Sequence, residues 1–213
     1  MEFIYKAKHF LLKIIKNPAT RLWISISFGV LLNFVYLAGN MLSTILYKSL
    51  WSATVTIYHL LFMTTRMYIL YMAKDGSKNN SSVCLRVGLF LFVLDLPAAF
   101  MMVYSVRNGA DVHYSGLLLL FFLLYTIYSV TNSIKGMIKW KNDNKPLHYA
   151  AKNITFASSL MSLFNLQFSL LSTLGLNFDA SEKVTVIAGF SVFFIMILLS
   201  FRLIRRGLSD SLR

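Results

Sequence analysis

The stretch that decides the fold is residues 184–204, VTVIAGFSVFFIMILLSFRLI, which carries no charged residue before Arg202. About 20 consecutive apolar residues are enough to cross the hydrocarbon core of a bilayer as an α-helix. Comparable stretches recur along the chain, and together they predict six membrane spans, at residues 22–45, 50–73, 85–106, 116–135, 153–175 and 184–204. We therefore expect an all-α polytopic membrane protein, a bundle of six transmembrane helices that forms one domain over residues 1–213.

The composition of the chain agrees with this class. Of the 213 residues, 57% are hydrophobic and only 14% are charged, whereas about a quarter of the residues of an average soluble domain are charged. The six predicted spans leave no segment long enough for a separate soluble domain. The composition therefore excludes most soluble folds.

The net charge of +13 has two interpretations, because a strongly basic chain can bind nucleic acid or face a membrane surface. Segments 1–21, 74–86, 135–152 and 202–213 hold 17 of the 21 basic residues. The remaining four are Lys48, Arg107 and Lys183 at the other ends of the spans and Arg66 within a span. This positive-inside pattern predicts a plasma-membrane protein with both termini cytoplasmic and basic segments that contact anionic inner-leaflet lipids. We expect no nucleic-acid partner.

Two further features concern the chain outside the spans. In residues 3–16, apolar side chains recur at helical spacing and the lysines lie elsewhere around the turn, which predicts an N-terminal amphipathic helix on the inner membrane surface. Aromatic residues gather near the predicted interfaces, as expected for a membrane aromatic belt. These residues are Tyr47, Trp51, Tyr104, Tyr114 and Trp140.

The sequence lacks several motifs that are typical of enzymes and metal centres. The chain has one cysteine, Cys84, and lacks HExxH, GxSxG and Walker-type patterns. We therefore expect neither a cofactor nor a bound metal. Whether the protein is an enzyme stays open, and the absence of these motifs argues against it.

The ionisable residues inside the predicted spans are His59, Arg66 and Asp95. Such residues are costly in a bilayer and mark functional sites by default. At 1.5 Å per residue, Arg66 lies about 12 Å and Asp95 about 15 Å from the inner edge, which predicts an ion pair if the two spans face each other. The pair could lock two helices in register; alternatively, Arg66 could bind an anionic group or Asp95 could exchange protons. Pro97 removes a backbone donor and predicts an unpaired carbonyl near residue 93.

Neutral polar residues recur at helical spacing in four spans. The stripes are Asn33, Tyr36 and Asn40; His59 and Arg66; Tyr125, Tyr128, Ser129 and Asn132; and Ser158, Ser162, Asn165, Ser169 and Ser172. Two interpretations remain open. The stripes could be hydrogen-bonded packing seams between helices, or they could converge on a central hydrated pocket.

Several short segments carry a resemblance. They are residues 17–21 (NPATR), 47–51 (YKSLW), Arg66, 146–154 (PLHYAAKNI), 159–163 (SLMSL) and 166–167 (LQ). These segments resemble a family of small, uncharacterised six-span membrane proteins of Gram-positive bacteria that has no assigned activity. The resemblance implies a fold and a host type, and it singles out Gln167, where similar proteins carry a polar residue. Asp95 is not part of the family pattern.

Two functions fit these observations. The first is a small-solute transporter or membrane substrate-binding subunit with a polar pocket between helices. Its candidate binding residues are Asn33, Tyr36, Asn40, His59, Arg66, Asp95, Asn132, Asn165 and Gln167. The alternative is a non-catalytic structural or accessory membrane protein that partners a larger complex or responds to the state of the envelope.

Overall fold

The computed structural model describes residues 18–75, 81–108, 114–139, 146–173 and 178–211. This part of the chain is all-helical, which confirms the all-α part of the expected fold class. The helices are α2 (Pro18–Tyr47), α3 (Leu50–Asp75), α4 (Ser81–Asn108), α5 (Gly116–Lys139), α6 (Pro146–Thr173) and α7 (Phe178–Ser211). The amphipathic helix predicted at residues 3–16 lies outside the described residues.

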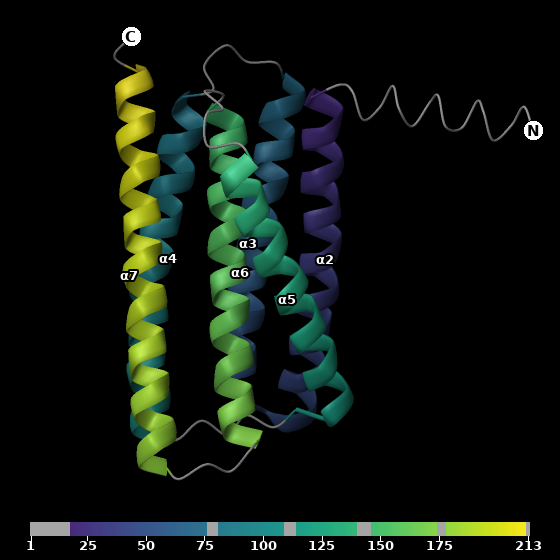
Figure 1. Ribbon diagram of the computed structural model, residues 1–213, viewed down its shortest axis with the longest axis vertical. Helices are drawn as coiled ribbons and strands as arrows, with labels where there is room; N and C mark the ends of the chain where they lie inside the picture. The colour runs from purple at the N-terminus through teal and green to yellow at the C-terminus, as the bar shows by residue number, and fades with distance from the viewer. Residues whose placement is uncertain (1–17, 76–80, 109–113, 140–145, 174–177, 212–213) are drawn as a thin grey trace, which may run out of the picture.

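The six helices form a bundle in which successive helices run in opposite directions (Figure 1). Helix α6 is the central member, because it contacts α2, α3, α4, α5 and α7. Helices α4 and α7 pair on one side of the bundle, and α2 lies on the other (Figure 1). The first residue of α2 and the last residue of α7 lie at the same end of the bundle.

Local sequence signals explain where several helices begin. Pro18 and Pro146 are the first residues of α2 and α6, a position that suits proline because its missing N–H would have no helical partner. Helix α2 ends before Lys48, whose φ of 51° lies in the left-handed region. The Ser49 hydroxyl then accepts a hydrogen bond from the Ser52 amide at 3.3 Å, which caps the start of α3.

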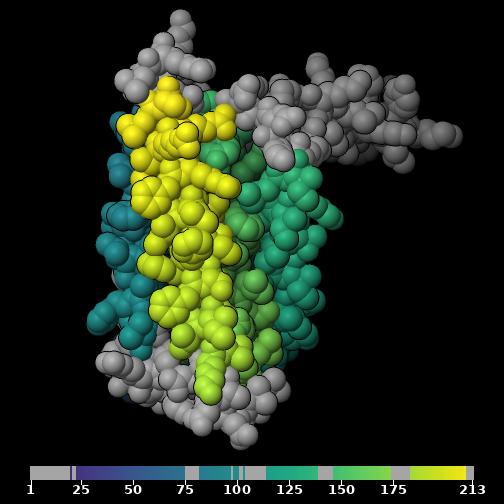
Figure 2. Space-filling model, turned by 60° about the vertical axis from the view of Figure 1, so that its left-hand side comes forward, coloured from purple at the N-terminus to yellow at the C-terminus, as the bar shows by residue number. Residues whose placement is uncertain are grey.

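The outer surface of the bundle is apolar. Along α7, the side chains of Ile187, Phe190, Phe194, Leu198 and Phe201 are 44 to 67% exposed and recur at helical spacing. Figure 2 shows α7 at the front of the molecule, with this outward face uncovered. A continuous exposed apolar surface of this kind is what lipid contact requires, and soluble monomers rarely carry one.

The interior, by contrast, holds many polar side chains. Fully buried polar residues include Asn33, Asn40, Ser43, Ser52, His59, Ser158, Ser159, Ser162, Asn165, Ser169 and Ser200. Soluble proteins keep most such residues at the surface. The combination of an apolar exterior and a polar interior supports a protein embedded in a membrane.

Among the described residues, five helices are long and apolar enough to cross a membrane. They are α2, α4, α5, α6 and α7, with candidate spans Trp23–Tyr47, Ser82–Phe100, Gly116–Ile138, Pro146–Thr173 and Lys183–Ser209. Helix α3 has a similar length of 26 residues but is not apolar enough to be among them, since it carries Ser52, His59 and Arg66. The span predicted at residues 50–73 is therefore a helix whose crossing of the membrane stays a prediction.

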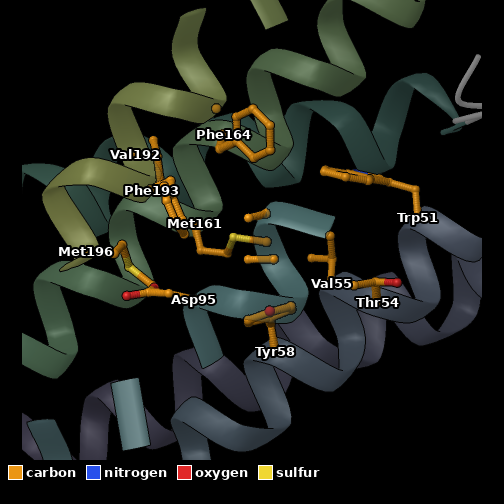
Figure 3. A pocket seen from close by; sticks show the side chains of 13 residues that line it. Trp51, Thr54, Val55, Tyr58, Asp95, Met161, Phe164, Val192, Phe193 and Met196 are labelled. Carbon is orange, nitrogen blue, oxygen red and sulfur yellow. The ribbon is translucent and has the colours of Figure 1, made fainter. Parts of the chain in front are cut away.

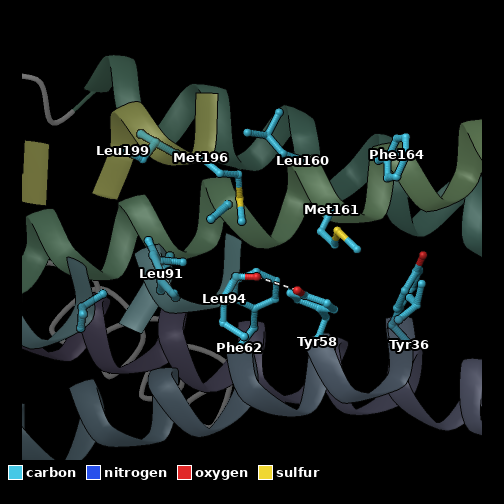
Figure 4. Close-up of a cluster of buried hydrophobic side chains, with 14 of the residues drawn as sticks. Tyr36, Tyr58, Phe62, Leu91, Leu94, Leu160, Met161, Phe164, Met196 and Leu199 are labelled. Carbon is cyan, nitrogen blue, oxygen red and sulfur yellow. Dashed lines mark hydrogen bonds between the residues drawn. The ribbon is translucent and has the colours of Figure 1, made fainter. Parts of the chain in front are cut away.

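A cluster of buried apolar side chains joins α2, α3, α4, α6 and α7 (Figure 4). Within it, the Tyr58 hydroxyl donates to the backbone carbonyl of Leu94 at 2.6 Å. Helix α4 runs through Pro97 without a break, and Leu94 neighbours the carbonyl that Pro97 leaves without an amide donor. A side chain from α3 therefore supplies a hydrogen bond where proline weakens the hydrogen bonding of α4.

Helices α4 and α7 approach each other closely through two glycines. A Cβ atom placed on Gly207 would lie 2.6 Å from the Leu85 amide nitrogen, and one on Gly88 would lie 2.9 Å from the Ile204 amide nitrogen. Both distances are too short for real atoms, so each position needs glycine. Small residues at helix crossings are the usual means of close packing in membranes.

The charge asymmetry of the sequence is retained in three dimensions. One end of the bundle holds the first residue of α2. The described basic side chains near this end are Lys74, Arg86, Lys135, Lys152, Arg202, Arg205 and Arg206. The opposite end holds Lys48 and Lys183. Which end faces the cytoplasm stays a prediction.

Candidate functional site

A group of buried polar and aromatic side chains lies between α2, α3, α5 and α6, and we call it the polar centre. Its members are Asn33, Tyr36, Asn40, Trp51, Ser52, His59, Arg66, Tyr114, Tyr125, Ser158 and Asn165, all of them buried. The sequence places these residues at helical spacing on α2, α3 and α6, so the packed helices turn them toward a common interior.

Asn165 of α6 is the main junction of the polar centre. Its Oδ1 accepts a hydrogen bond from the indole N–H of Trp51 at 2.8 Å, and its Nδ2 donates to the Tyr36 hydroxyl at 2.8 Å. One amide therefore joins α6 to both α3 and α2. The Tyr36 ring in turn packs against the rings of His59 and Tyr125, with centroids 4.3 and 4.4 Å away.

A second junction lies at Asn40, toward the end of α2. Its Oδ1 accepts a hydrogen bond from the Tyr114 hydroxyl at 3.1 Å, while its Nδ2 donates to the Tyr36 backbone carbonyl at 2.9 Å. The Ser52 hydroxyl donates to the Tyr114 hydroxyl at 3.1 Å. These bonds tie the start of α3 and the residues before α5 to α2.

The third junction is Asn33, deeper in α2. Its Oδ1 accepts hydrogen bonds from the Tyr125 hydroxyl at 2.7 Å and from the Ser158 hydroxyl at 3.3 Å. Its Nδ2 is buried without a hydrogen-bond partner. Asn33 therefore joins α2 to α5 and α6 through its acceptor and leaves one donor group free.

Other unpartnered polar atoms lie in the same region. Both ring nitrogens of His59 and the Nε of Arg66 are buried without a hydrogen-bond partner. Buried polar atoms in proteins are nearly always hydrogen-bonded, so a group of unpartnered ones calls for a physical explanation. Here the unpartnered groups belong to Asn33 of α2 and to His59 and Arg66 of α3, and each of these side chains can donate a hydrogen bond.

Arg66 does not form the predicted ion pair with Asp95. The Arg66 guanidinium lies against α2, where its Nη1 is 2.5 Å from the position that a Cβ on Gly29 would occupy. Both carboxylate oxygens of Asp95 are buried without a hydrogen-bond partner. The prediction was wrong because equal depth on neighbouring helices does not make two side chains face each other: Arg66 points to α2, whereas Asp95 faces α7.

Asp95 belongs to a different part of the bundle. It lines a cavity between α3, α4, α6 and α7, together with Tyr58, Met161 and Met196. The Ser200 hydroxyl faces it from α7 but donates to the Met196 carbonyl at 3.0 Å. Asp95 is therefore not part of the polar centre.

Two further candidates also lie outside the polar centre. Asn132 is exposed on the outer surface of α5, as is Tyr128, whereas Tyr125 and Ser129 of the same predicted stripe are buried. Gln167 is partly exposed, and its Nε2 donates to the Val184 carbonyl of α7 at 3.4 Å. Gln167 thus faces a different neighbour from the serine stripe of α6, as expected from helical geometry.

The serine stripe of α6 is buried over most of its length. Ser158, Ser162, Asn165 and Ser169 are buried, but Ser172 is exposed.

Sequence reasoning assigned Trp51 and Tyr114 to the aromatic belt, yet both have buried hydrogen bonds in the polar centre. A residue near a helix end can face lipid or point inward, and composition does not distinguish the two. Helical spacing could have placed Trp51 in the interior. It lies on one buried face of α3 together with Val55, Tyr58 and Phe62.

Comparison with known proteins adds no relative. No family model, no curated protein and no solved structure matches this chain.

Proposed function

We propose that this chain is a multi-pass membrane protein that binds a small solute with an anionic group in the polar centre, as a transporter or a membrane substrate-binding subunit. The observation that carries the proposal is the buried cation Arg66, which has no ion-pair partner among the described residues. Arg66 is 4% exposed, so its guanidinium is withdrawn from bulk solvent. An anion brought by a solute would complete the site.

The charge of the surroundings supports an anionic ligand. Burying an ionised group without a counterion is unfavourable by many kcal/mol, so buried charges are normally paired. Asp95 is the one acidic residue whose side chain the structure describes, and it faces the cavity on the other side of α3. The polar centre therefore carries a positive charge that no described acidic side chain balances.

The available donors suit an oxyanion such as a carboxylate or a phosphate. A guanidinium offers several N–H groups in a planar arrangement that matches such groups. The free Nδ2 of Asn33 and the ring of His59 would add hydrogen bonds from α2 and α3. Tyr36, Tyr125 and Asn165 would hold these groups in place through the bonds described above.

The membrane placement completes the proposal. Helix α3 would be the sixth span, because its length and its contacts with α2, α4 and α6 match those of its neighbours. Its polar side chains Ser52, His59 and Arg66 face the interior of the bundle. Both termini would then lie on the cytoplasmic side of the plasma membrane, where the basic helix ends would contact anionic lipids.

Thiol labelling tests whether water and solutes reach the polar centre. Cys84 is the only cysteine of the chain and is replaced first, as Cys84→Ser. Ser158→Cys then places a thiol beside Asn33. We expect a small membrane-impermeant thiol reagent to label this variant in intact cells or inside-out vesicles, and acetate, phosphate or sulfate to slow the labelling.

Ser191→Cys is the matched control for this experiment. Ser191 lies on α7 with its side chain exposed on the apolar outer surface, so lipid should shield it from the reagent. If Ser158→Cys is folded and stays unlabelled from both sides, the polar centre is a dry packing seam and the solute-binding proposal fails.

Gly29→Ala tests the role of Arg66 without removing its charge. The new Cβ would lie 2.5 Å from Nη1 and 3.3 Å from Cζ of Arg66, so the guanidinium must move away from α2. We expect a folded protein whose affinity for the protecting anion falls at least tenfold, about 1.4 kcal/mol. The measurement is the anion-dependent rise in melting temperature of the purified protein.

Gly136→Ala is the control, because nothing lies within 4 Å of the Cβ it adds. It should leave the anion-dependent rise unchanged. Equal responses to the anion in Gly29→Ala and the unaltered protein would exclude Arg66 in its present position as the binding group.

One observation favours the alternative of a structural or accessory protein. The oxygens of Asn33, Asn40 and Asn165 all accept hydrogen bonds from neighbouring segments, and a rigid scaffold could use the same network. Purification in mild detergent separates the two functions, since an accessory protein should bring down a partner in fixed ratio. A partner of that kind, together with an unlabelled Ser158→Cys, would favour the accessory function.

A further inference from the structure

The cavity beside Asp95 is a second polar feature of the interior, separate from the polar centre. It has a volume of about 30 Å³ and lies between α3, α4, α6 and α7. Asp95 and Met196 lie at one end of it, and Trp51 and Thr54 lie at the other (Figure 3). The remaining lining is mostly apolar, with Val55, Ala98, Ala99, Met161, Phe164, Val192 and Phe193 among its residues.

Asp95 is unusual among the cavity residues because it is an acid that is only 2% exposed and both of its carboxylate oxygens are buried without a hydrogen-bond partner. We propose that Asp95 and this cavity form a proton-binding site, in which the carboxyl group takes up and releases a proton through water that enters the cavity. This site goes beyond the anion site proposed above and does not depend on it.

The size of the cavity limits what can occupy it. A volume of about 30 Å³ holds about two water molecules, which is too little for an organic cation. A hard metal cation needs several oxygen ligands, whereas the polar side chains that line the cavity are Asp95, Tyr58 and Thr54. Water and a proton fit both the space and the available groups.

The chemistry of the carboxyl group leads to the same occupant. An ionised carboxylate in an apolar site without hydrogen bonds is strongly disfavoured, and such a group takes up a proton instead. Two waters could solvate the ionised form for the time that it exists. The cavity therefore supplies what a reversible proton site needs, a lone acid and a place for water beside it.

The groups around Asp95 do not provide a competing charge. From α3, Tyr58 lines the cavity with its hydroxyl donated to the Leu94 carbonyl. From α6 and α7, the described lining residues have no ionisable side chain. The other buried ionisable residues of α3, His59 and Arg66, contact Tyr36 and Gly29 of α2 instead. Asp95 can thus change its protonation without breaking an ion pair to a described residue.

Infrared difference spectroscopy of the full chain in lipid vesicles tests this directly, without any transport assay. Spectra are compared between acidic and alkaline buffer. We expect a carboxylic-acid C=O band that appears at acidic pH, shifts in deuterated water and disappears in Asp95→Asn. Asp75→Asn, at the end of α3, is the control and should keep the band.

Two results would overturn the proposal. The first is a band that persists unchanged in Asp95→Asn, or that is absent from the unaltered protein at every pH at which it is folded. The second is a carboxylate signal that responds to sodium ions at constant pH, which would make the site one for a metal cation. If Asp95→Asn does not fold, Asp95→Glu serves in its place, and an unchanged band position in that variant would equally exclude Asp95.

Discussion

Replacing Gly207 by alanine is expected to destabilise the bundle strongly, although the change adds a single methyl group. That group would lie 2.6 Å from the Leu85 amide nitrogen and 2.9 Å from its Cα. These are backbone atoms, which cannot rotate away as a side chain can, so α7 must move away from α4. Overpacking of this kind costs about 1–3 kcal/mol and more where backbone must shift.

The measurement is the melting temperature of the purified protein in detergent, together with its yield from membranes. Gly88→Ala should have a similar effect, since its Cβ would lie 2.9 Å from the Ile204 amide nitrogen and the Leu203 Cβ. Gly136→Ala meets nothing within 4 Å and should keep or slightly raise stability, because alanine is the better helix former. A Gly207→Ala protein as stable as Gly136→Ala would contradict the close approach of α4 and α7.

Replacing Asn165 by leucine is the second substitution with a large expected effect. Leucine removes both hydrogen bonds of the Asn165 amide and leaves the Trp51 indole N–H and the Tyr36 hydroxyl without these partners in the interior. Each buried group left unsatisfied costs about 1–3 kcal/mol. We therefore expect a loss of about 2–4 kcal/mol in the free energy of unfolding, measured by denaturant titration in detergent.

Gln167→Leu is the matched control for this prediction. Gln167 carries the same kind of amide two residues along α6, but it is partly exposed and its one hydrogen bond is long, at 3.4 Å. Interhelical hydrogen bonds in membrane proteins average about 0.6 kcal/mol, so the loss here should be no larger. Equal losses in the two variants would mean that Asn165 is not the junction described above.

The composition of the polar centre was predictable in large part. The stripes at Asn33, Tyr36 and Asn40 and at Ser158, Ser162 and Asn165 follow helical spacing. All six residues are buried, and all but Ser162 belong to the polar centre. Spacing of three or four residues places side chains on one helix face whatever the helix packs against. A polar face in an otherwise apolar span turns away from lipid, because burial against other helices is less costly than exposure to hydrocarbon.

The pairing of residues between helices was not predictable in the same way. Arg66 and Asp95 have similar depths, but depth leaves the rotation of each helix about its axis undetermined. In the stripe of α5, Tyr125 faces the interior while Tyr128 and Asn132 face outward. A stripe of mixed spacing can therefore divide between two faces of one helix, and spacing alone does not say which residues of it turn inward.

By itself, the sequence determined that the protein is a helical bundle, with helices long and apolar enough to cross a membrane and basic residues concentrated near one set of helix ends. Those properties follow from hydropathy, periodicity and charge, each of which acts within a single helix. Only the tertiary structure decided that Arg66 lies against Gly29, that Asp95 faces a cavity and that Gly88 and Gly207 bring α4 and α7 together. These features depend on which helix faces meet, and that is set by the fit of side chains across the whole bundle.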